Sequence, residues 1–309
     1  MISDIVISIY NGFENKACVI NELLKRNYYD CCIKGGSDYI EQSSLYKGKK
    51  IILKIIPICI LSGIPCLIGI GGPIHIDKLN SEINLLIKSN IDIHKLLYID
   101  ENATIIHKDS KLKYGDIHFL KLKTILSNAP IKTSINKFLL YYNRRLYEGA
   151  NGFYSYDGDL FKNSDPSNTT TIYSKLNPKL IGNIIGVANI FECYKNSAKK
   201  HVNEIYAAYE EFNYNNSNII SLDDLLLSFN WIDIDKLKLA IKQTGVNIVY
   251  ILGIDILKNV SNYGIYANNS KIEFDNMNEF KDYITFTLDN IDGVSEVKTE
   301  NIENTNSDI

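Results

Sequence analysis

The chain has 309 residues, enough for one large domain with a sizeable core or for two smaller ones. Its 33 Lys and Arg residues nearly balance its 36 Asp and Glu residues, which argues against a nucleic-acid-binding or membrane-surface protein. The N-terminus lacks the basic segment and cleavage site of a signal peptide, so we expect a cytoplasmic protein. Frequent Asn, Ile, Lys and Tyr are typical of a low-GC bacterium or its phage, and a viral protein would act in the host cytoplasm or the virion.

The N-terminal third predicts buried strands alternating with helices. Short apolar runs between turn residues indicate strands at 3–9, 28–34, 49–56, 64–71 and 95–100, and helical spacing indicates helices at 15–27 and 79–90. The apolar stretch 51–76 is long enough to cross a bilayer. Its prolines and four glycines divide it into two buried strands joined by a turn, so we expect no membrane segment.

The remainder of the chain predicts the same alternation. We expect a helix at 134–143, a strand entering a Gly-rich loop at 144–159, a long apolar helix at 178–197, a core strand at 247–255, a strand pair at 263–274 and a helix at 278–291. No linker divides the chain. We therefore predict one α/β domain over residues 1–297, with a mostly parallel sheet covered by helices on both faces, a reduced or divergent region at 105–140 and a polar, disordered tail at 298–309.

The six cysteines show no CxxC spacing and no Cys/His pattern typical of a metal site. Buried free thiols in a reducing compartment are the better interpretation. The five histidines also lack the spacing of metal ligands, so the sequence predicts no metal site.

The segment IYNGFENKAC (9–18) has the layout of a phosphate-binding loop, because an apolar strand leads through a glycine turn into a helix. However, the turn holds a single glycine, Gly12, and a phenylalanine, Phe13, where a nucleotide site would use a small or acidic residue. Added side chains restrict the close approach of a phosphate to the backbone. The segment is typical of a phosphate loop that has lost its chemistry.

Several short motifs occur in the order found in one enzyme family. They are GFENKAC (12–18), GGSDYIEQ (35–42), KIIPICIL (54–61), LNSEI (79–83), EGANG (148–152), PSNTT (166–170), NPKLIGNIIGVANIF (177–191), SFNWIDIDKLKLA (228–240) and LGIDIL (252–257). In this order the chain resembles the adenylosuccinate synthetase family, the GTP-dependent ligases that join aspartate to IMP, together with phage relatives that act on dGMP. The resemblance covers most of the chain except about 105–140 and implies the α/β fold of that family.

The resemblance also implies that two catalytic groups have been replaced. The family's base, the Asp of GDEGKGK, falls on Phe13, which cannot take a proton. The family's catalytic His falls on Glu41, which would repel a phosphate. Glu41 could instead serve as a Mg²⁺ ligand or substitute base, but an exposed loop glutamate is the better interpretation. The same loop keeps Gly12, Glu14 and Lys16. If activity persists, the resemblance implies GTP and Mg²⁺ as cofactors.

The other candidates for nucleotide binding are Gly35, Gly36, Asn151 and Asp255. The resemblance places Asn151 at a Gln that contacts IMP, and Asp255 at a carboxylate that reads guanine, although Asp255 could equally be a strand-end or helix-cap aspartate. The family's TTGRG segment has no counterpart in 105–140. The aspartate-binding loop falls on 219–227, which contains no arginine to hold a carboxylate.

These observations leave three functions open. The first is a catalytically degenerate homologue kept as a binding or structural module. The second is an active ligase for IMP or dGMP, and the third is a protein that binds purine nucleotides without turnover. The family is usually dimeric and lends an arginine across the interface, so Arg144 or Arg145 could serve a homodimer. Tyr-rich stretches at 141–156 and 206–214 would suit either a protein partner or packing in the core.

Overall fold

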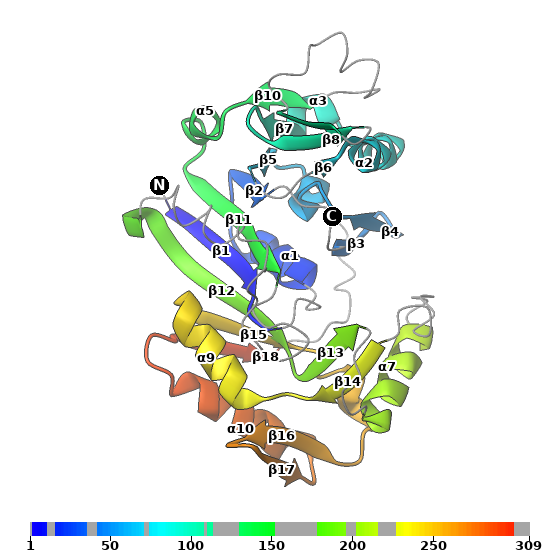
Figure 1. Ribbon diagram of the computed structural model, residues 1–309, viewed down its shortest axis with the longest axis vertical. Coiled ribbons are helices and arrows are strands. Elements are labelled where there is room, and N and C mark those ends of the chain that lie inside the picture. Colours follow the sequence, from blue (N-terminus) through cyan, green and yellow to red (C-terminus); the bar gives the residue numbers. More distant parts are fainter. Residues whose placement is uncertain are drawn as a thin grey trace.

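The computed structural model describes residues 2–10, 16–35, 42–70, 74–107, 110–113, 130–151, 178–195, 202–215 and 227–299. Its centre is a nine-stranded sheet with the order β10-β7-β5-β2-β11-β1-β12-β15-β18 (Figure 1). The strands are β1 (Ile2–Ser8), β2 (Cys31–Gly35), β5 (Cys66–Gly69), β7 (Leu97–Asp100), β10 (Ile131–Thr133), β11 (Arg144–Asn151), β12 (Ile181–Asn189), β15 (Ile248–Leu252) and β18 (Glu296–Thr299). All neighbouring pairs in this sheet run parallel, which confirms the predicted fold class.

Strand β1 is the point from which the chain builds the sheet in both directions. From β1 the chain adds β2, β5, β7 and β10 outward on one side and then returns to insert β11 between β2 and β1. It finally adds β12, β15 and β18 on the other side. In open parallel sheets, ligands bind outside the carboxyl ends of the strands where the direction of winding changes. The carboxyl end of β1, which residues 11–15 follow, is therefore the expected ligand crevice.

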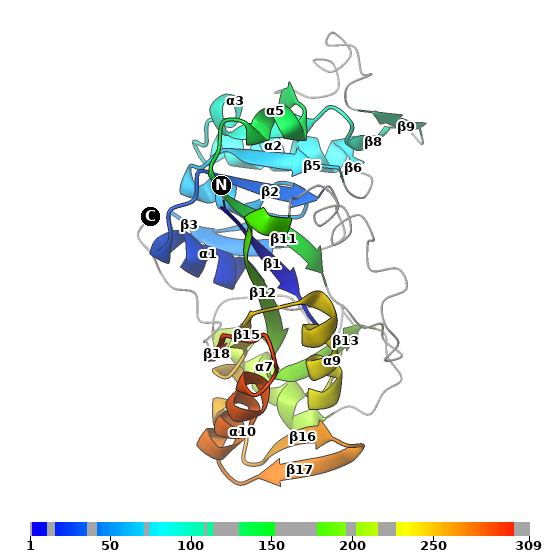
Figure 2. The ribbon, with the colours of Figure 1, turned by 90° about the vertical axis from the view of Figure 1, so that its left-hand side faces the viewer.

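Helices cover both faces of the sheet, as predicted (Figure 2). The described helices are α1 (Lys16–Arg26), α2 (Ile76–Lys88), α3 (Ile93–Leu96), α5 (Ile135–Leu139), α7 (Asn203–Asn215), α9 (Ile234–Thr244) and α10 (Met277–Asp289), with 3₁₀ helices η1 (Ile58–Ser62), η3 (Pro178–Leu180) and η4 (Ile256–Asn259). Val6 of β1 belongs to one core cluster with Ile20 of α1, whereas Ile7 belongs to another with Leu237 of α9. Because successive strand residues point to opposite faces, α1 and α9 lie on opposite sides of the sheet.

Smaller sheets accompany the central sheet, and the pair β16–β17 lies at the lower end of the view (Figure 1). They are formed by β3 (Gln42–Tyr46) with β4 (Lys49–Leu53), β6 (Ile74–His75) with β8 (Thr104–His107) and β9 (Ser110–Lys113), β13 (Phe191–Lys195) with β14 (Leu227–Trp231), and β16 (Tyr263–Ala267) with β17 (Ser270–Phe274). The rings of Tyr206 and Tyr209 on α7 lie 6.0 and 4.9 Å from the ring of Phe229 on β14. These two tyrosines therefore serve core packing.

The segment 178–197 is not the long apolar helix that its apolar pattern predicts. It forms η3, β12 and β13, and β12 lies between β1 and β15 in the central sheet. A strand buried on both faces is apolar throughout, so its pattern cannot be told from that of a buried helix. The β-branched residues and the two glycines of IGNIIGVAN favour a strand over a helix.

The remaining differences concern element ends. The predicted helix 134–143 is the short α5, and residues 298–299 belong to the edge strand β18 and not to the tail. The stretch 51–76 contains the end of β4, the turn η1 and strand β5, as expected. Within the ranges given above, no helix is long and apolar enough to cross a membrane.

Gly186 on β12 allows close packing between the sheet and its neighbours. A Cβ atom at this position would lie 2.7 Å from Cδ1 and 3.0 Å from Cγ2 of Ile9, and 2.9 Å from Cγ1 of Val246. We expect Gly186→Ala to destabilise the fold by about 1–3 kcal/mol, because overpacking a buried site forces its neighbours to move. Urea unfolding measures this change.

Gly69→Ala is the matched control, since its nearest contact, the backbone oxygen of Lys34, lies at 3.3 Å. Gly69→Ala should lower the free energy of unfolding by less than Gly186→Ala does. An equal or greater loss of stability in Gly69→Ala would contradict the role of Gly186.

Candidate functional site

The predicted nucleotide-binding residues gather at the carboxyl edge of the sheet where the structure describes them. Gly12, Phe13, Glu14, Gly36 and Glu41 lie outside the described residues. Gly35 ends β2, Asn151 ends β11, Lys16 begins α1 after the β1 loop, and Asp255 follows β15. Asn151 is paired in register with Ser8, the last residue of β1. The fold thus places Asn151 beside the strand that leads into the predicted phosphate loop.

A buried ion pair lies at the same edge, between β2 and β11. Nζ of Lys34 is 3.6 Å from Oε2 of Glu148, and the two side chains are 8% and 1% exposed. The Lys34 ammonium also donates to the backbone oxygen of Lys54 at 2.9 Å and to Oε1 of Gln42 at 3.3 Å. Removing one member of a buried pair leaves an uncompensated charge and costs about 3–5 kcal/mol. Lys34 therefore neutralises a carboxylate inside the fold.

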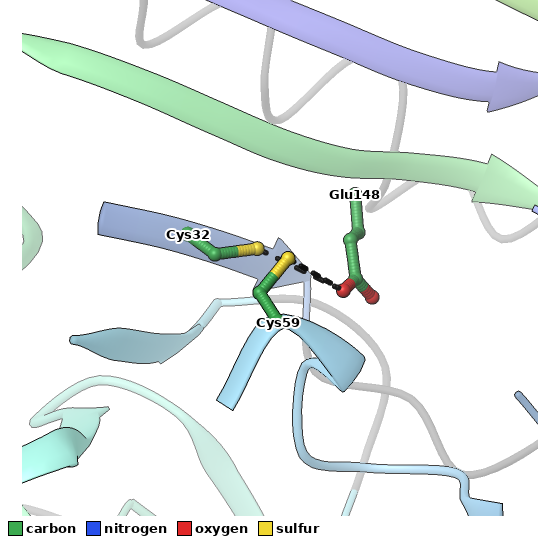
Figure 3. Close-up of side chains that lie close together, drawn as sticks. All are labelled: Cys32, Cys59 and Glu148. Carbon is green, nitrogen blue, oxygen red and sulfur yellow. Dashed lines mark hydrogen bonds between the residues drawn. The ribbon is translucent and has the colours of Figure 1, made fainter. Parts of the chain in front are cut away.

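The other oxygen of Glu148 faces a different set of donors (Figure 3). Oε1 accepts the backbone N–H of Ile58 at 3.0 Å and the thiols of Cys32 and Cys59 at 3.7 and 3.6 Å. Burial raises the pKa of both thiols well above the usual range, so both carry their protons at neutral pH. Among the described His, Cys, Asp and Glu residues, Cys32, Cys59 and Glu148 form the group with converging donor atoms that could hold a metal ion.

The cysteines otherwise match their interpretation as buried free thiols. Five of the six are buried, none is in a disulfide, and Cys18 is partly exposed. Cys31 and Cys32 are neighbours on β2, but they belong to the core clusters on opposite faces of the sheet. Only Cys32 can therefore face η1 and Cys59.

A second buried carboxylate, Glu82 on α2, holds the segment that leads into η1. Its two oxygens accept the backbone N–H groups of residues 54–56 at distances between 2.7 and 3.2 Å. Burial raises the pKa of Glu82 and outweighs these N–H groups, which lower it. Because η1 carries Cys59, Glu82 helps to position a group that contacts Glu148. The glutamate of the LNSEI motif is thus a structural residue.

Asp255 lies directly before η4 and is 5% exposed. It stands at the N-cap position of η4, although its side chain makes no capping hydrogen bond to that helix. Gly253, with a φ of 89°, allows the chain to turn between β15 and Asp255. The contact of Asp255 with guanine stays a prediction.

The chain is anchored just before the predicted phosphate loop. Tyr10 is buried, and its hydroxyl donates to the carboxylate of Glu192 on β13. Glu192 is also buried, and its Oε1 lies 4.0 Å from Nζ of Lys236 on α9. The exit from β1 is therefore fixed to the antiparallel pair β13–β14.

The two arginines considered for a dimer interface differ in their surroundings. Arg145 is 3% exposed and donates to the backbone oxygens of Leu139 and Tyr142 at 2.8 and 2.9 Å. Arg144 is exposed and lies over the ring of Tyr29. Arg145 is thus committed within its own chain, and Arg144 is the better placed of the two for an intersubunit contact.

Comparison with solved structures identifies the architecture. The chain matches an adenylosuccinate synthetase from Plasmodium falciparum with a TM-score of 0.69 and 12% identity, over 92% of this chain and 95% of that chain. It matches the succinoaminodeoxyadenylate synthetase of cyanophage S-2L, solved with dGMP and dATP, with a TM-score of 0.61 and 11% identity, over 93% and 99% of the two chains. The chain has the adenylosuccinate synthetase fold. No family model and no curated protein matches the sequence.

Within the adenylosuccinate synthetase fold, the sequence motifs contained two buried charged residues whose partners were not predicted. Lys34 directly precedes Gly35, and Glu148 opens EGANG. A lysine and a glutamate at the ends of apolar strands are seldom buried unless they are paired. This rule could have suggested the pair. No comparable signal linked Cys32 to Cys59.

The titration of Glu82 gives a test of this buried network. In Glu82→Gln, an amide N–H₂ would face backbone N–H donors. We therefore expect the free energy of unfolding to fall by about 1–3 kcal/mol. The pKa of the Glu82 carboxyl is higher in the folded than in the unfolded protein. Wild-type stability therefore falls as the pH rises from the unfolded pKa of this carboxyl through its folded pKa. Because glutamine does not titrate, the penalty of Glu82→Gln should narrow from acidic to neutral pH.

Urea unfolding of both proteins over that pH range measures the difference. Glu273→Gln, at an exposed carboxylate on β17, is the control and should show a small difference at each pH. A penalty that widens as the pH rises would mean that the pKa of Glu82 is lowered in the folded protein.

Proposed function

We propose that the protein does not catalyse ligation and serves as a binding or structural module built on the adenylosuccinate synthetase fold. The observation that carries this proposal is Phe13 in the loop between β1 and α1. The loop follows the central strand at the change of winding direction, where a ligand would bind. The order of the motifs puts Phe13 at the place of the base, and a phenyl ring can neither take a proton nor bind Mg²⁺.

The cations near this edge support the same proposal. Phosphoryl transfer depends on positive groups that face the nucleotide. Lys34, at the end of β2, directs its ammonium to Glu148 and to the backbone of Lys54. Arg145 directs its guanidinium to backbone oxygens of its own chain. Lys34 and Arg145 thus use their charges to stabilise the fold. The proposed module would act through a protein partner or a second copy of the chain.

An active ligase is the alternative that one residue favours. Glu14 follows Phe13 directly and supplies a carboxylate in the same loop. The cyanophage S-2L synthetase was solved with dGMP and dATP, which gives the second pair of substrates to test beside IMP and GTP. A third function, nucleotide binding without turnover, would use Asp255 and Asn151.

A phosphate-release assay tests the proposal. The purified protein is mixed with Mg²⁺, aspartate, GTP or dATP, and IMP or dGMP, and phosphate is measured with and without aspartate. We expect no aspartate-dependent release, because the loop lacks the family's base and Glu41 replaces the family's histidine. Glu14→Gln is the matched control, since it removes the carboxylate that directly follows Phe13.

Aspartate-dependent release in the wild type that Glu14→Gln abolishes would overturn the proposal in favour of an active ligase. Aspartate-dependent release that persists in Glu14→Gln and is lost in Glu41→Gln would also overturn the proposal, with Glu41 as the base. Thermal melting with the same nucleotides separates the third function, because a ligand that binds the folded state raises its stability. A nucleotide could raise the melting temperature without any phosphate release. If Asp255→Asn removed this rise, the protein would be identified as a nucleotide-binding protein.

A further inference from the structure

Three side chains from distant parts of the sequence meet in the core beneath the carboxyl edge of the sheet (Figure 3). Cys32 comes from β2, Cys59 from η1 and Glu148 from β11. Each offers one donor atom, and these atoms all lie within 4.8 Å of one another. We propose that Cys32, Cys59 and Glu148 bind a divalent thiophilic metal ion of the zinc class.

The distances between the donors fit such an ion. Oε1 of Glu148 lies 3.7 Å from Sγ of Cys32 and 3.6 Å from Sγ of Cys59. In tetrahedral zinc sites, Zn–S bonds of about 2.3 Å and Zn–O bonds of about 2.1 Å separate a sulfur from an oxygen by about 3.6 Å. Oε1 of Glu148 therefore already lies at the distance from each sulfur that coordination requires, and the two sulfurs lie within 4.8 Å of each other.

The charges around the group select a divalent ion. Two thiolates and the Glu148 carboxylate carry three negative charges, and the Lys34 ammonium 3.6 Å from Glu148 supplies one positive charge. A divalent cation makes this set neutral. Binding replaces two thiol protons, which leave to solvent, with one M²⁺ ion, so the net charge of the core does not change. The usual cost of burying a net charge is thereby avoided.

Charge and ligand type argue against other metal ions. Cu⁺ also prefers thiolates, but it would leave one negative charge uncompensated in the core. Mg²⁺ and Ca²⁺ prefer oxygen ligands, and this group offers two sulfurs and one carboxylate. Zinc accepts a mixed set of sulfur and oxygen ligands, and Co²⁺ or Cd²⁺ can report on such a site.

The surroundings hold the donors in place. Oε1 of Glu148 is fixed by the N–H of Ile58, and Glu82 fixes the backbone that leads to η1. Cys66 on β5 is paired in register with Cys32 and supplies a further sulfur beside it. Cys32 and Cys59 are fully buried and Glu148 is 1% exposed, so the ion would be taken up as the chain folds. Such support of the ligands by neighbouring groups is a general feature of protein metal sites.

The metal content of the full-length protein tests this proposal. The chain is produced in zinc-supplemented medium, desalted in the presence of a chelator, and analysed for zinc by mass spectrometry. We expect the wild type to hold stoichiometric zinc that is released only on unfolding in guanidinium. Cys32→Ala should lose this zinc, whereas Cys31→Ala should keep it. Both thiols are fully buried on the same strand, and they differ in the face that they occupy.

Wild-type protein without zinc, or equal loss of zinc in Cys31→Ala and Cys32→Ala, would overturn the proposal. Cobalt gives a second readout that does not depend on the folding of a variant. Wild-type protein refolded with Co²⁺ should develop the near-ultraviolet absorption of thiolate-to-cobalt charge transfer. The absence of this band in folded protein would equally refute a site formed by Cys32 and Cys59.

Discussion

The buried carboxylate of Glu148 is the constraint on which this part of the structure depends. An ionised carboxylate that is 1% exposed must be compensated, because the cost of removing a charge from water is large. Lys34 supplies the charge, and the Ile58 N–H supplies a hydrogen bond. The ammonium of Lys34 in turn binds Gln42 on β3. One carboxylate thus connects β2, β11, η1 and the β3–β4 hairpin.

This network also limits what the edge of the sheet can do. A cation that neutralises a buried carboxylate cannot at the same time face a nucleotide phosphate at full strength. Moving Lys34 toward a ligand would leave Glu148 uncompensated, at a cost of about 3–5 kcal/mol. The fold therefore gains stability from the paired charges of Lys34 and Glu148, which face each other inside the protein.

Local patterns predicted the elements that depend on local properties. β1, β2, β5 and β15 are short apolar runs bounded by turn residues, and α1, α2 and α10 have apolar residues at helical spacing. The pattern failed at 178–197, because β12 is covered on both faces and so lacks the alternation that marks a strand. Contacts between distant segments could not be predicted from local sequence patterns. Nothing in the spacing of Cys32, Cys59 and Glu148 indicates that they meet, since their approach is set by strand order and by the turn η1.

The proposed core ion and the proposed loss of ligase activity are physically compatible, because they concern different residues. A ligand or ion that binds only the folded chain stabilises it in proportion to its affinity. Under the proposed function, a fold without a bound nucleotide would lack that stabilisation. An ion between β2, η1 and β11 would stabilise the fold from within its core, at β11, which pairs with β1, and at the next strand, β2. Its donors are separate from Phe13 and Asp255, so the ion would stabilise the scaffold without restoring the chemistry of the loop.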